Sequence, residues 1–201
     1  MSVIPEIKFK ELLEEEKFNL PVRFVSENPG EYSGNFPVVV KISSEKIVHK
    51  TEAGAVITDI KSREELIKTY KDMSRKFPGE TIYVEEMAKR GTEIIIGMIN
   101  DPSFGKMILL GIGGFFSELI NDVTFKKVPI DIFDAEDMIS ELKYSRLLDG
   151  YRGFKASKDI VKELLLKVSD FGLRTEFSQI DLNPVFLYED HYLIVDAKMI
   201  V

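Results

Sequence analysis

Hydrophobic positions recur along the chain with two different spacings, which predict strands and helices in turn. Short apolar runs bounded by turn residues predict strands, over residues 37–42, 55–60, 81–85, 92–100, 106–113 and 122–129. Apolar residues at helical spacing predict helices, over residues 9–18, 62–77, 134–142 and 157–171. Because strands and helices do not alternate throughout, a doubly wound parallel sheet is not expected.

The end of the chain has the pattern of a hairpin. One strand runs to Leu187, a polar turn covers residues 189–191, and a second strand runs to Ala197. The whole chain, 1–201, is therefore expected to form one α+β domain with two α/β lobes. The small lobe covers about residues 21–84, and the large lobe covers about 85–201 together with the helix 9–18.

Composition narrows the possible functions. Apolar residues make up 44% of the 201 residues and charged residues 30%, which is typical of a soluble globular protein. No apolar run approaches the roughly 18 residues of a membrane span, and the start of the chain is too charged for a secretory signal. The net charge of -7 argues against nucleic acid as the main ligand. We expect a cytoplasmic protein that acts neither on membranes nor on nucleic acids.

Metal and thiol chemistry are limited by the residue types present. Cysteine is absent, which excludes disulfides, thiolate metal sites and cysteine nucleophiles. Only two histidines occur, which argues against a multi-histidine metal site. Binding of a hard cation through oxygen ligands remains open.

The stretch from Pro37 to Val56 combines features that suit phosphate chemistry. A buried strand ends near Lys41, and a polar turn with His49 and Lys50 leads to the small residues around Gly54. A lysine neutralises phosphates, a glycine lets backbone N–H groups approach them, and a histidine can take up a phosphoryl group. The same pattern also fits two strands joined by an exposed loop with a solvated histidine.

Two common nucleotide motifs are not complete. Gly111, Gly113 and Gly114 open like a dinucleotide-binding fingerprint, but Phe116 occupies the place of its third glycine. No P-loop sequence occurs. The three glycines fit either a close backbone approach to a ligand or a tight turn.

The C-terminal hairpin carries a candidate magnesium site. Asp181 and Asn183 are two residues apart on one strand and therefore share a face, and Asp196 lies on the returning strand. Oxygen ligands on paired strands suit Mg²⁺, which keeps waters and shares ligands with phosphates. The alternative is a set of polar residues on a solvated sheet face.

The junction between the lobes is a candidate nucleoside site. Glu85, Glu86 and Met87 lie where an adenine could rest against the main chain, and Glu93 could accept hydrogen bonds from ribose hydroxyls. A solvated lobe boundary would have the same sequence. His191, in the hairpin turn, is expected to be inert.

Seven segments, taken in order, resemble the ATP-grasp β subunit or domain of NDP-forming acyl-CoA synthetases, and more distantly succinyl-CoA synthetase β. They are PVVVK, HKTEAGAV, YVEEM, EIIIGMINDPSFG, GIGGFFSELINDVTFK, LLDGYRG and IDLNPVFL with VDAK. The resemblance covers roughly Pro37 to Lys198. It implies an ATP-grasp fold whose nucleotide cleft lies between the two lobes.

The resemblance also implies roles for individual residues. Lys41 would contact nucleotide phosphates, Glu85 to Met87 would form the adenine hinge, and Glu93 would bind ribose. Asn183 and Asp196 would hold Mg²⁺, with Asp181 beside them. His49 would be phosphorylated transiently, passing phosphate from a phosphohistidine of the partner to ADP, while Lys41, Lys50 and Mg²⁺ stabilise the phosphoryl oxygens.

Two positions depart from the family pattern. Ala55 stands where the family usually has a second glycine next to Gly54, and Lys126 replaces an arginine that would contact phosphate in a bidentate manner. The helix that usually precedes Pro37 is also missing from the pattern. These changes bear on rate and nucleotide affinity more than on the fold.

The implied activity is that of an ADP-forming acetate–CoA ligase subunit: acyl-CoA + ADP + phosphate ⇌ acid + CoA + ATP. It requires a CoA-binding α subunit, in an expected α2β2 heterotetramer, with Mg²⁺ as cofactor and ATP or ADP as substrate. Two alternatives remain open: a non-catalytic nucleotide-binding module, which Ala55 and Lys126 favour, and a ligase that forms an acyl-phosphate directly, against which His49 argues.

Overall fold

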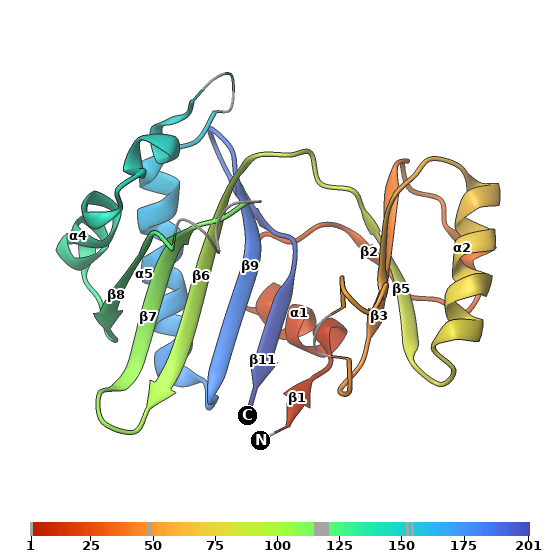
Figure 1. The fold of residues 1–201 in the computed structure, drawn as a ribbon, viewed down its shortest axis with the longest axis horizontal. Helices are drawn as coiled ribbons and strands as arrows, with labels where there is room; N and C mark the ends of the chain where they lie inside the picture. The colour runs from red at the N-terminus through yellow and green to blue at the C-terminus, as the bar shows by residue number, and fades with distance from the viewer. Residues whose placement is uncertain (1, 48–49, 115–120, 152, 154) are drawn as a thin grey trace.

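The computed structural model describes residues 2–47, 50–114, 121–151, 153 and 155–201, and its two sheets lie side by side (Figure 1). The larger sheet is antiparallel in the order β1-β11-β9-β6-β7-β8, and β10 also pairs with β9. Its strands are β1 (Val3–Ile4), β6 (Thr92–Asp101), β7 (Gly105–Ile112), β8 (Val123–Lys127), β9 (Gln179–Leu187), β10 (Tyr192–Ile194) and β11 (Ala197–Ile200).

The smaller sheet has the order β2-β5-β3-β4 and is also antiparallel. Its strands are β2 (Arg23–Phe24), β3 (Val38–Ser43), β4 (Val56–Ile60) and β5 (Thr81–Glu86). The helix α2 (Arg63–Lys76) covers its outer face (Figure 1). A 3-10 turn, η1 (Pro29–Glu31), precedes β3. The apolar side chains of β3 and α2, among them Val40 and Leu66, form the core of this lobe.

Helices α1 (Glu6–Glu15), α4 (Ile132–Glu141) and α5 (Lys158–Arg174) belong to the larger lobe, as does the 3-10 turn η2 (Ser145–Asp149). Figure 1 shows α5 behind the larger sheet and α1 near its edge toward the smaller sheet. Phe9 and Leu13 of α1 join Leu164 and Leu165 of α5 in one hydrophobic core with the sheet. Apolar burial therefore fixes α1 to the larger lobe.

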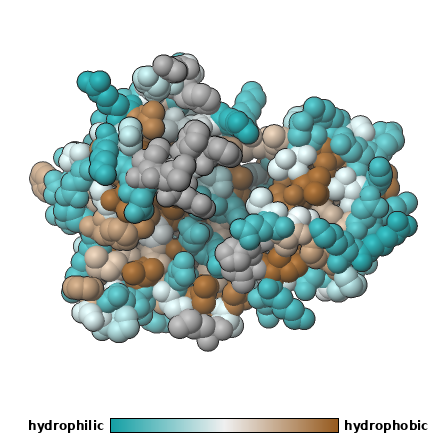
Figure 2. All heavy atoms as spheres, viewed as in Figure 1, coloured by the Kyte–Doolittle hydropathy of each residue, from teal (hydrophilic) through white to brown (hydrophobic). Residues whose placement is uncertain are grey.

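Figure 2 shows how hydrophilic and hydrophobic residues are distributed over one face of the two lobes. Hydrophilic residues cover the outline of both lobes, and hydrophobic residues reach the surface over each sheet. Two apolar side chains of the larger sheet, Ile99 on β6 and Phe125 on β8, are 43% and 51% exposed. Within the described residues, no helix is both long and apolar enough to cross a membrane.

The predicted α+β architecture of two lobes is confirmed as two sheets with helices. The six strands predicted between residues 37 and 129 lie within about two residues of those observed, whereas the last strand, expected to end at Ala197, runs on to Ile200. The first helix was placed wrongly at 9–18, because it begins after Pro5 and ends at Glu15, before Lys17 adopts a φ of 61°. The lobe boundaries stay a prediction.

The C-terminal hairpin forms as expected, but its returning strand is interrupted. β10 and β11 both pair with β9 and are separated by Val195 and Asp196. At the interruption, the N–H of Asn183 donates to the carbonyl of Asp196 at 3.1 Å, and the N–H of Val195 donates to Pro184. Asp196 is thereby held next to Asn183 at the edge of the sheet that faces the smaller lobe.

Candidate functional site

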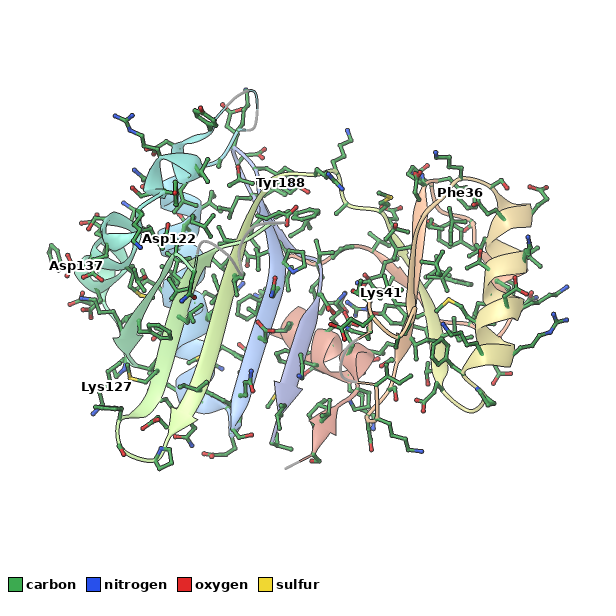
Figure 3. The ribbon with its side chains drawn as sticks, in the orientation of Figure 1. Phe36, Lys41, Asp122, Lys127, Asp137 and Tyr188 are labelled. Carbon is green, nitrogen blue, oxygen red and sulfur yellow. The ribbon has the colours of Figure 1, made fainter. Side chains whose placement is uncertain are left out.

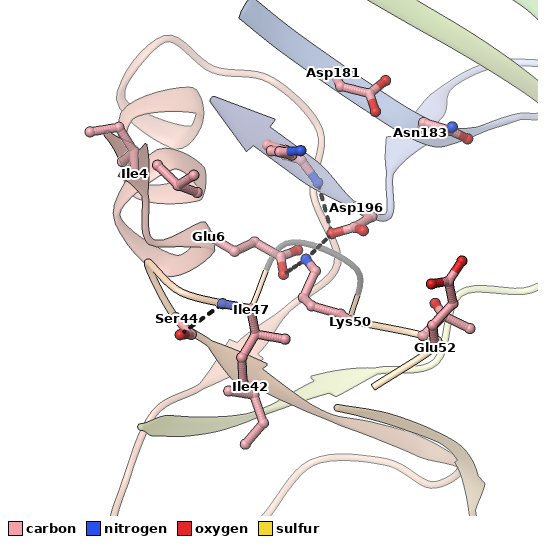
Figure 4. Close-up of a pocket in the computed structure, with 14 residues that line it drawn as sticks. Ile4, Glu6, Ile42, Ser44, Ile47, Lys50, Glu52, Asp181, Asn183 and Asp196 are labelled. Carbon is pink, nitrogen blue, oxygen red and sulfur yellow. Dashed lines mark hydrogen bonds and ion pairs between the residues drawn. The ribbon is translucent and has the colours of Figure 1, made fainter. Parts of the chain in front are cut away.

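A cavity of about 360 Å³ lies between the two lobes (Figure 4). It is lined by residues of the N-terminal segment, the smaller lobe and the C-terminal strands: Val3, Ile4, Glu6, Ile42, Ser44, Ile47, Lys50, Thr51, Glu52, Asp181, Asn183, Asp196, Ala197 and Lys198. Its volume is at the lower end of the range typical of small-molecule sites. Lysines and carboxylates meet in it, which suits a ligand that carries both phosphates and a metal ion.

The predicted oxygen ligands line one wall of this cavity. Asp181, Asn183 and Asp196 come from β9 and from the link between β10 and β11, and the register of these strands brings them together (Figure 4). Among the described residues, no three His, Cys, Asp or Glu side chains form a ready-made metal cage. Two carboxylates and an amide oxygen nevertheless fit Mg²⁺, which completes its shell with waters and substrate phosphates.

Burial perturbs both carboxyl groups of this wall. Burial raises the pKa of Asp181, and the charge of Lys198 opposes that rise. Burial and then the charge of Glu6 raise the pKa of Asp196 to about 6, against the effects of Lys50 and Lys41. A bound cation would relieve this cost, because it stabilises the charged carboxylates.

Lys50 holds Asp196 from the opposite side of the cavity. Its ammonium donates to Asp196 Oδ1 at 2.5 Å and also to the carboxylate of Glu6 (Figure 4). Burial alone would lower the pKa of Lys50. The charges of Glu6 and Asp196 outweigh this effect, and the pKa of Lys50 lies above its usual value. Lys50 is therefore a cation within a partly enclosed site, next to the proposed metal ligands.

Lys41, on β3, lies between the two lobes (Figure 3). Its Nζ atom is 2.7 Å from Glu85 Oε2, 2.7 Å from the carbonyl oxygen of Val195 and 3.6 Å from Glu6 Oε1. Burial would lower the pKa of Lys41, but the charges of Glu6 and Glu85 raise it well above its usual value. Lys41 itself does not line the cavity: it is 4% exposed and lies behind the cavity-lining residue Glu6.

The turn that carries Lys50 is closed by backbone hydrogen bonds. The N–H of Ala55 donates to the carbonyl of Lys50 at 2.7 Å, and that of Gly54 donates to Thr51 at 3.0 Å. Gly54 has a φ of 64°, which favours glycine. Gly54 itself is not among the cavity-lining residues, so its contribution is to shape the turn. The predicted phosphoryl acceptor, His49, lies outside the described residues.

The three residues predicted to form the adenine hinge, Glu85 to Met87, do not line the cavity. The side chain of Glu85 is buried in ion pairs with Lys10 and Lys41. The N–H of Glu86 donates to Val22 and that of Met87 donates to Pro37, so both donors are used within the protein. Neither Glu86 nor Met87 lines the cavity in this structure.

Glu93 and Lys126 were also expected at the site, and the structure places both away from the cavity. The carbonyl of Glu93 accepts from the N–H of Gly113 at 2.8 Å, at the start of β6. Lys126 pairs with Asp137 at 3.2 Å and with Asp134 at 3.8 Å on α4. Figure 3 shows Asp137 at the side of the larger lobe opposite Lys41. The observed ion pairs therefore give Lys126 a partner other than a nucleotide.

Two charged residues of α1 were missed by the sequence analysis. Glu6 lines the cavity and is 4% exposed, and Lys10 is fully buried, with 0% exposure. Their spacing of four residues places them on one helix face, and their Nζ and Oε1 atoms are 2.9 Å apart. The spacing was visible in the sequence, but their partners are distant in the chain.

Comparisons with known proteins agree on one family. The ATP-grasp domain family matches residues 5–201. Subunit beta of acetate–CoA ligase [ADP-forming] I from Pyrococcus furiosus is 36% identical over 98% of this chain and 90% of its own length. Acetate–CoA ligase [ADP-forming] II from Archaeoglobus fulgidus is 36% identical over 83% of this chain. The chain spans only 25% of that longer relative.

Solved structures give the same result. The chain is similar to the dinucleotide-forming acetyl-coenzyme A synthetase 1 of Ca. Korarchaeum cryptofilum in complex with coenzyme A, Ca-AMPCP and HgCl+, with a TM-score of 0.91 and 33% identity over 100% of this chain and 93% of that one. A second structure of that synthetase contains coenzyme A and Mg-AMPPCP, with its phosphohistidine segment pointing towards the nucleotide binding site. Its TM-score is 0.85, with 34% identity over 98% of this chain and 91% of that one.

Proposed function

Since this chain belongs to the ATP-grasp domain family of ADP-forming acetyl-CoA synthetases, we propose that it is the nucleotide-binding β subunit of an ADP-forming acyl-CoA synthetase. The reaction is acyl-CoA + ADP + phosphate ⇌ acid + CoA + ATP. The observation that carries the proposal is the cavity between the lobes, where the cation Lys50 meets the oxygen donors Asp181, Asn183 and Asp196. Lys41 lies behind the cavity wall, 3.6 Å from the cavity-lining residue Glu6.

Within this proposal, Asn183 and Asp196 hold Mg²⁺, with Asp181 beside them. The bound ion neutralises phosphate charge. Lys41 contacts the nucleotide phosphates, and Lys50 stabilises the oxygens of the phosphoryl group in transfer. Glu85 to Met87 and Glu93 are assigned to the adenine and the ribose. Gly54 and Lys126 contribute to phosphate binding, with Lys126 first leaving Asp137.

His49 is the proposed phosphoryl carrier. Its ring nitrogen takes the phosphoryl group from a phosphohistidine of the partner, and that nitrogen–phosphorus bond then breaks as a β-phosphate oxygen of ADP forms ATP. Two aligned transfers cover a distance that one in-line transfer cannot. Support comes from Ile47 and Lys50, which flank residues 48–49 and line the cavity, and from the phosphohistidine segment described for the Korarchaeum synthetase.

The partner is a CoA-binding α subunit, in an α2β2 assembly. The name of the Pyrococcus relative, a beta subunit, supports a separate partner chain. Acyl-CoA and phosphate bind mainly to that partner. The acid is not fixed by this chain, because related ligases are named for acetate and for 4-hydroxybutyrate.

A non-catalytic nucleotide-binding module is the second candidate. The ion pairs of Lys126 with Asp134 and Asp137 favour it, because they occupy the cation that replaces the family's arginine. Both candidates bind nucleotide, and only phosphoryl transfer to His49 separates them. A ligase that forms an acyl-phosphate directly would not need that histidine.

The test is phosphorylation of the purified chain with its α subunit, Mg²⁺ and γ-labelled ATP. Wild type is compared with His49→Asn and with His191→Asn as the matched control, since His191 lies in the hairpin turn with its Nδ1 atom 2.6 Å from Asp190 Oδ1. Acid-labile, base-stable label on this chain in wild type and His191→Asn, but not in His49→Asn, supports the relay. Nucleotide binding without label on this chain contradicts it and favours the non-catalytic module.

A further inference from the structure

The most unusual residue of the interlobe region is Lys10, which the proposed function does not use. It lies on α1 with an exposed fraction of 0% and does not line the cavity. Burying a lysine is costly unless its charge is compensated by good geometry. Its ammonium is 2.5 Å from Glu85 Oε1, 2.9 Å from Glu6 Oε1 and 2.8 Å from the carbonyl oxygen of Val195. One buried charge thus links α1 to both sheets.

Lys10 and Lys41 share the same partners. The ammonium of Lys10 pairs with Oε1 of Glu85, and that of Lys41 pairs with Oε2. Both ammonium groups also donate to the carbonyl of Val195. Without Lys10, both oxygens of Glu85 would be available to Lys41, and the cluster would hold one more negative than positive charge. Val195 also precedes Asp196, so the shared carbonyl fixes the segment that carries a proposed metal ligand.

The charges of the cluster balance only when Lys10 is counted. Lys10, Lys41 and Lys50 face three carboxylates, those of Glu6, Glu85 and Asp196. Losing one cation would leave a net negative charge beside the place where phosphates are to bind. In a poorly solvated region, such a charge repels an anion far more strongly than it would in water.

We propose that Lys10 is a positioning residue of the nucleotide site: by neutralising Glu85 and holding the Val195 carbonyl, it keeps the Lys41 ammonium available for phosphate. This inference rests on the proposed function, because it presumes that Lys41 binds nucleotide phosphates. Lys10 itself touches no ligand. Its effect is therefore specific to the charged part of the nucleotide.

The test measures dissociation constants for ADP with Mg²⁺ and for adenosine, by calorimetry or by competition with a fluorescent ADP analogue. Lys10→Met keeps most of the side-chain length and removes the charge. Lys8→Met is the matched control, because Lys8 is exposed on the same helix. We expect Lys10→Met to weaken ADP binding by about tenfold or more and adenosine binding by less than about threefold. Lys8→Met should change neither.

The outcomes separate the two proposals. If wild type does not bind ADP, the proposed function is wrong and this inference fails with it. If wild type binds ADP and Lys10→Met binds it equally well, only the inference is wrong. An equal loss of ADP and adenosine binding also overturns it, because a general structural role affects both ligands.

A second variant covers the case in which Lys10→Met does not fold, as judged by circular dichroism. Lys10→Met combined with Glu6→Gln removes the cation together with a carboxylate whose Oε1 atom lies 2.9 Å from its ammonium. We expect the ratio of the ADP and adenosine dissociation constants to stay within about threefold of wild type. A selective tenfold loss of ADP binding in the double variant would overturn the charge argument.

Discussion

Removing the charge of Glu6 should destabilise the folded protein more than any change at an exposed carboxylate. Glu6 is 4% exposed and compensates three lysines: Lys10 at 2.9 Å, Lys41 at 3.6 Å and Lys50 in direct contact. Glu6→Gln keeps the shape of the side chain but leaves one buried positive charge in excess. Breaking a buried ion pair on one side costs about 3–5 kcal/mol. We expect the free energy of unfolding to fall by about that amount at pH 7.

The measurement is equilibrium unfolding in urea, followed by circular dichroism. The matched control is Glu16→Gln, at the C-terminal end of the same helix. Glu16 Oε1 and Oε2 each accept from the guanidinium of Arg174 at 3.0 Å, but this pair is exposed to solvent, and exposed pairs contribute little. We therefore expect Glu16→Gln to unfold close to wild type. Near-equal curves for wild type and Glu6→Gln would refute the assignment of Glu6 as the shared partner of three buried cations.

The pH dependence of the free energy of unfolding is a second test of the role of Glu6. Burial would raise the pKa of Glu6, but the charges of Lys41, Lys10 and Lys50 hold it well below its usual range. As pH falls, the unfolded chain therefore takes up this proton before the folded protein does. The stabilisation is complete above the pKa of an unfolded glutamate, about 4.3, and is lost as pH falls through the lowered value. Glu6→Gln should lack this part of the acid-induced loss of stability.

Three further changes test other parts of the structure. Gly91→Ala should lower the free energy of unfolding by about 1–3 kcal/mol in urea titrations, because a Cβ atom there would lie 2.4 Å from the carbonyl oxygen of Leu187. The control Gly97→Ala should unfold near wild type, because its Cβ atom would meet no atom closer than 3.7 Å. Asp122→Asn should cost about 1–3 kcal/mol by the same assay, since the buried carboxylate accepts from the N–H groups of Lys143 and Tyr144, both at 2.9 Å; an unchanged midpoint would contradict this. Asp196→Asn should weaken ADP binding in Mg²⁺ by about tenfold in calorimetry and leave binding in EDTA nearly unchanged; equal losses in both conditions would argue against a metal-binding role.

Local patterns predicted most of the fold because the forces that form these elements act between residues close in sequence. The capping signal of α2 is an example: the Oγ atom of Ser62 accepts from the N–H of Glu65 at 3.2 Å. The carboxylate of Glu65 accepts from the N–H of Lys61 and not from that of Ser62, so these two residues do not form the reciprocal pair of a capping box. Strands β1 and β2 have two residues each, too few for any alternation of polar and apolar positions to be visible.

The candidate site was only partly accessible to this reasoning. Asp181, Asn183 and Asp196 could be grouped because two strands of a hairpin face each other. Lys10 and Glu85 are 75 positions apart, and Lys10 and Val195 are 185 apart, so no local pattern indicates that they meet. The position of Lys10 between the apolar residues Phe9 and Leu12 is compatible with burial. It is equally compatible with an exposed helix surface, and only the placement of the small lobe against α1 decides between the two.

Helix α1 joins the two lobes by two different forces, and this difference bears on how the site works. Its apolar residues Phe9 and Leu13 pack into the core of the larger lobe, whereas Lys10 reaches the smaller lobe through an ion pair with Glu85. Ion pairs respond to a nearby anion, and apolar contacts do not. A bound phosphate that attracts Lys41 would draw it away from Glu85. Glu85 would then be paired with Lys10 alone. The contact that holds the lobes together and the group proposed to bind phosphate are thus parts of one electrostatic cluster, and altering either should alter the other.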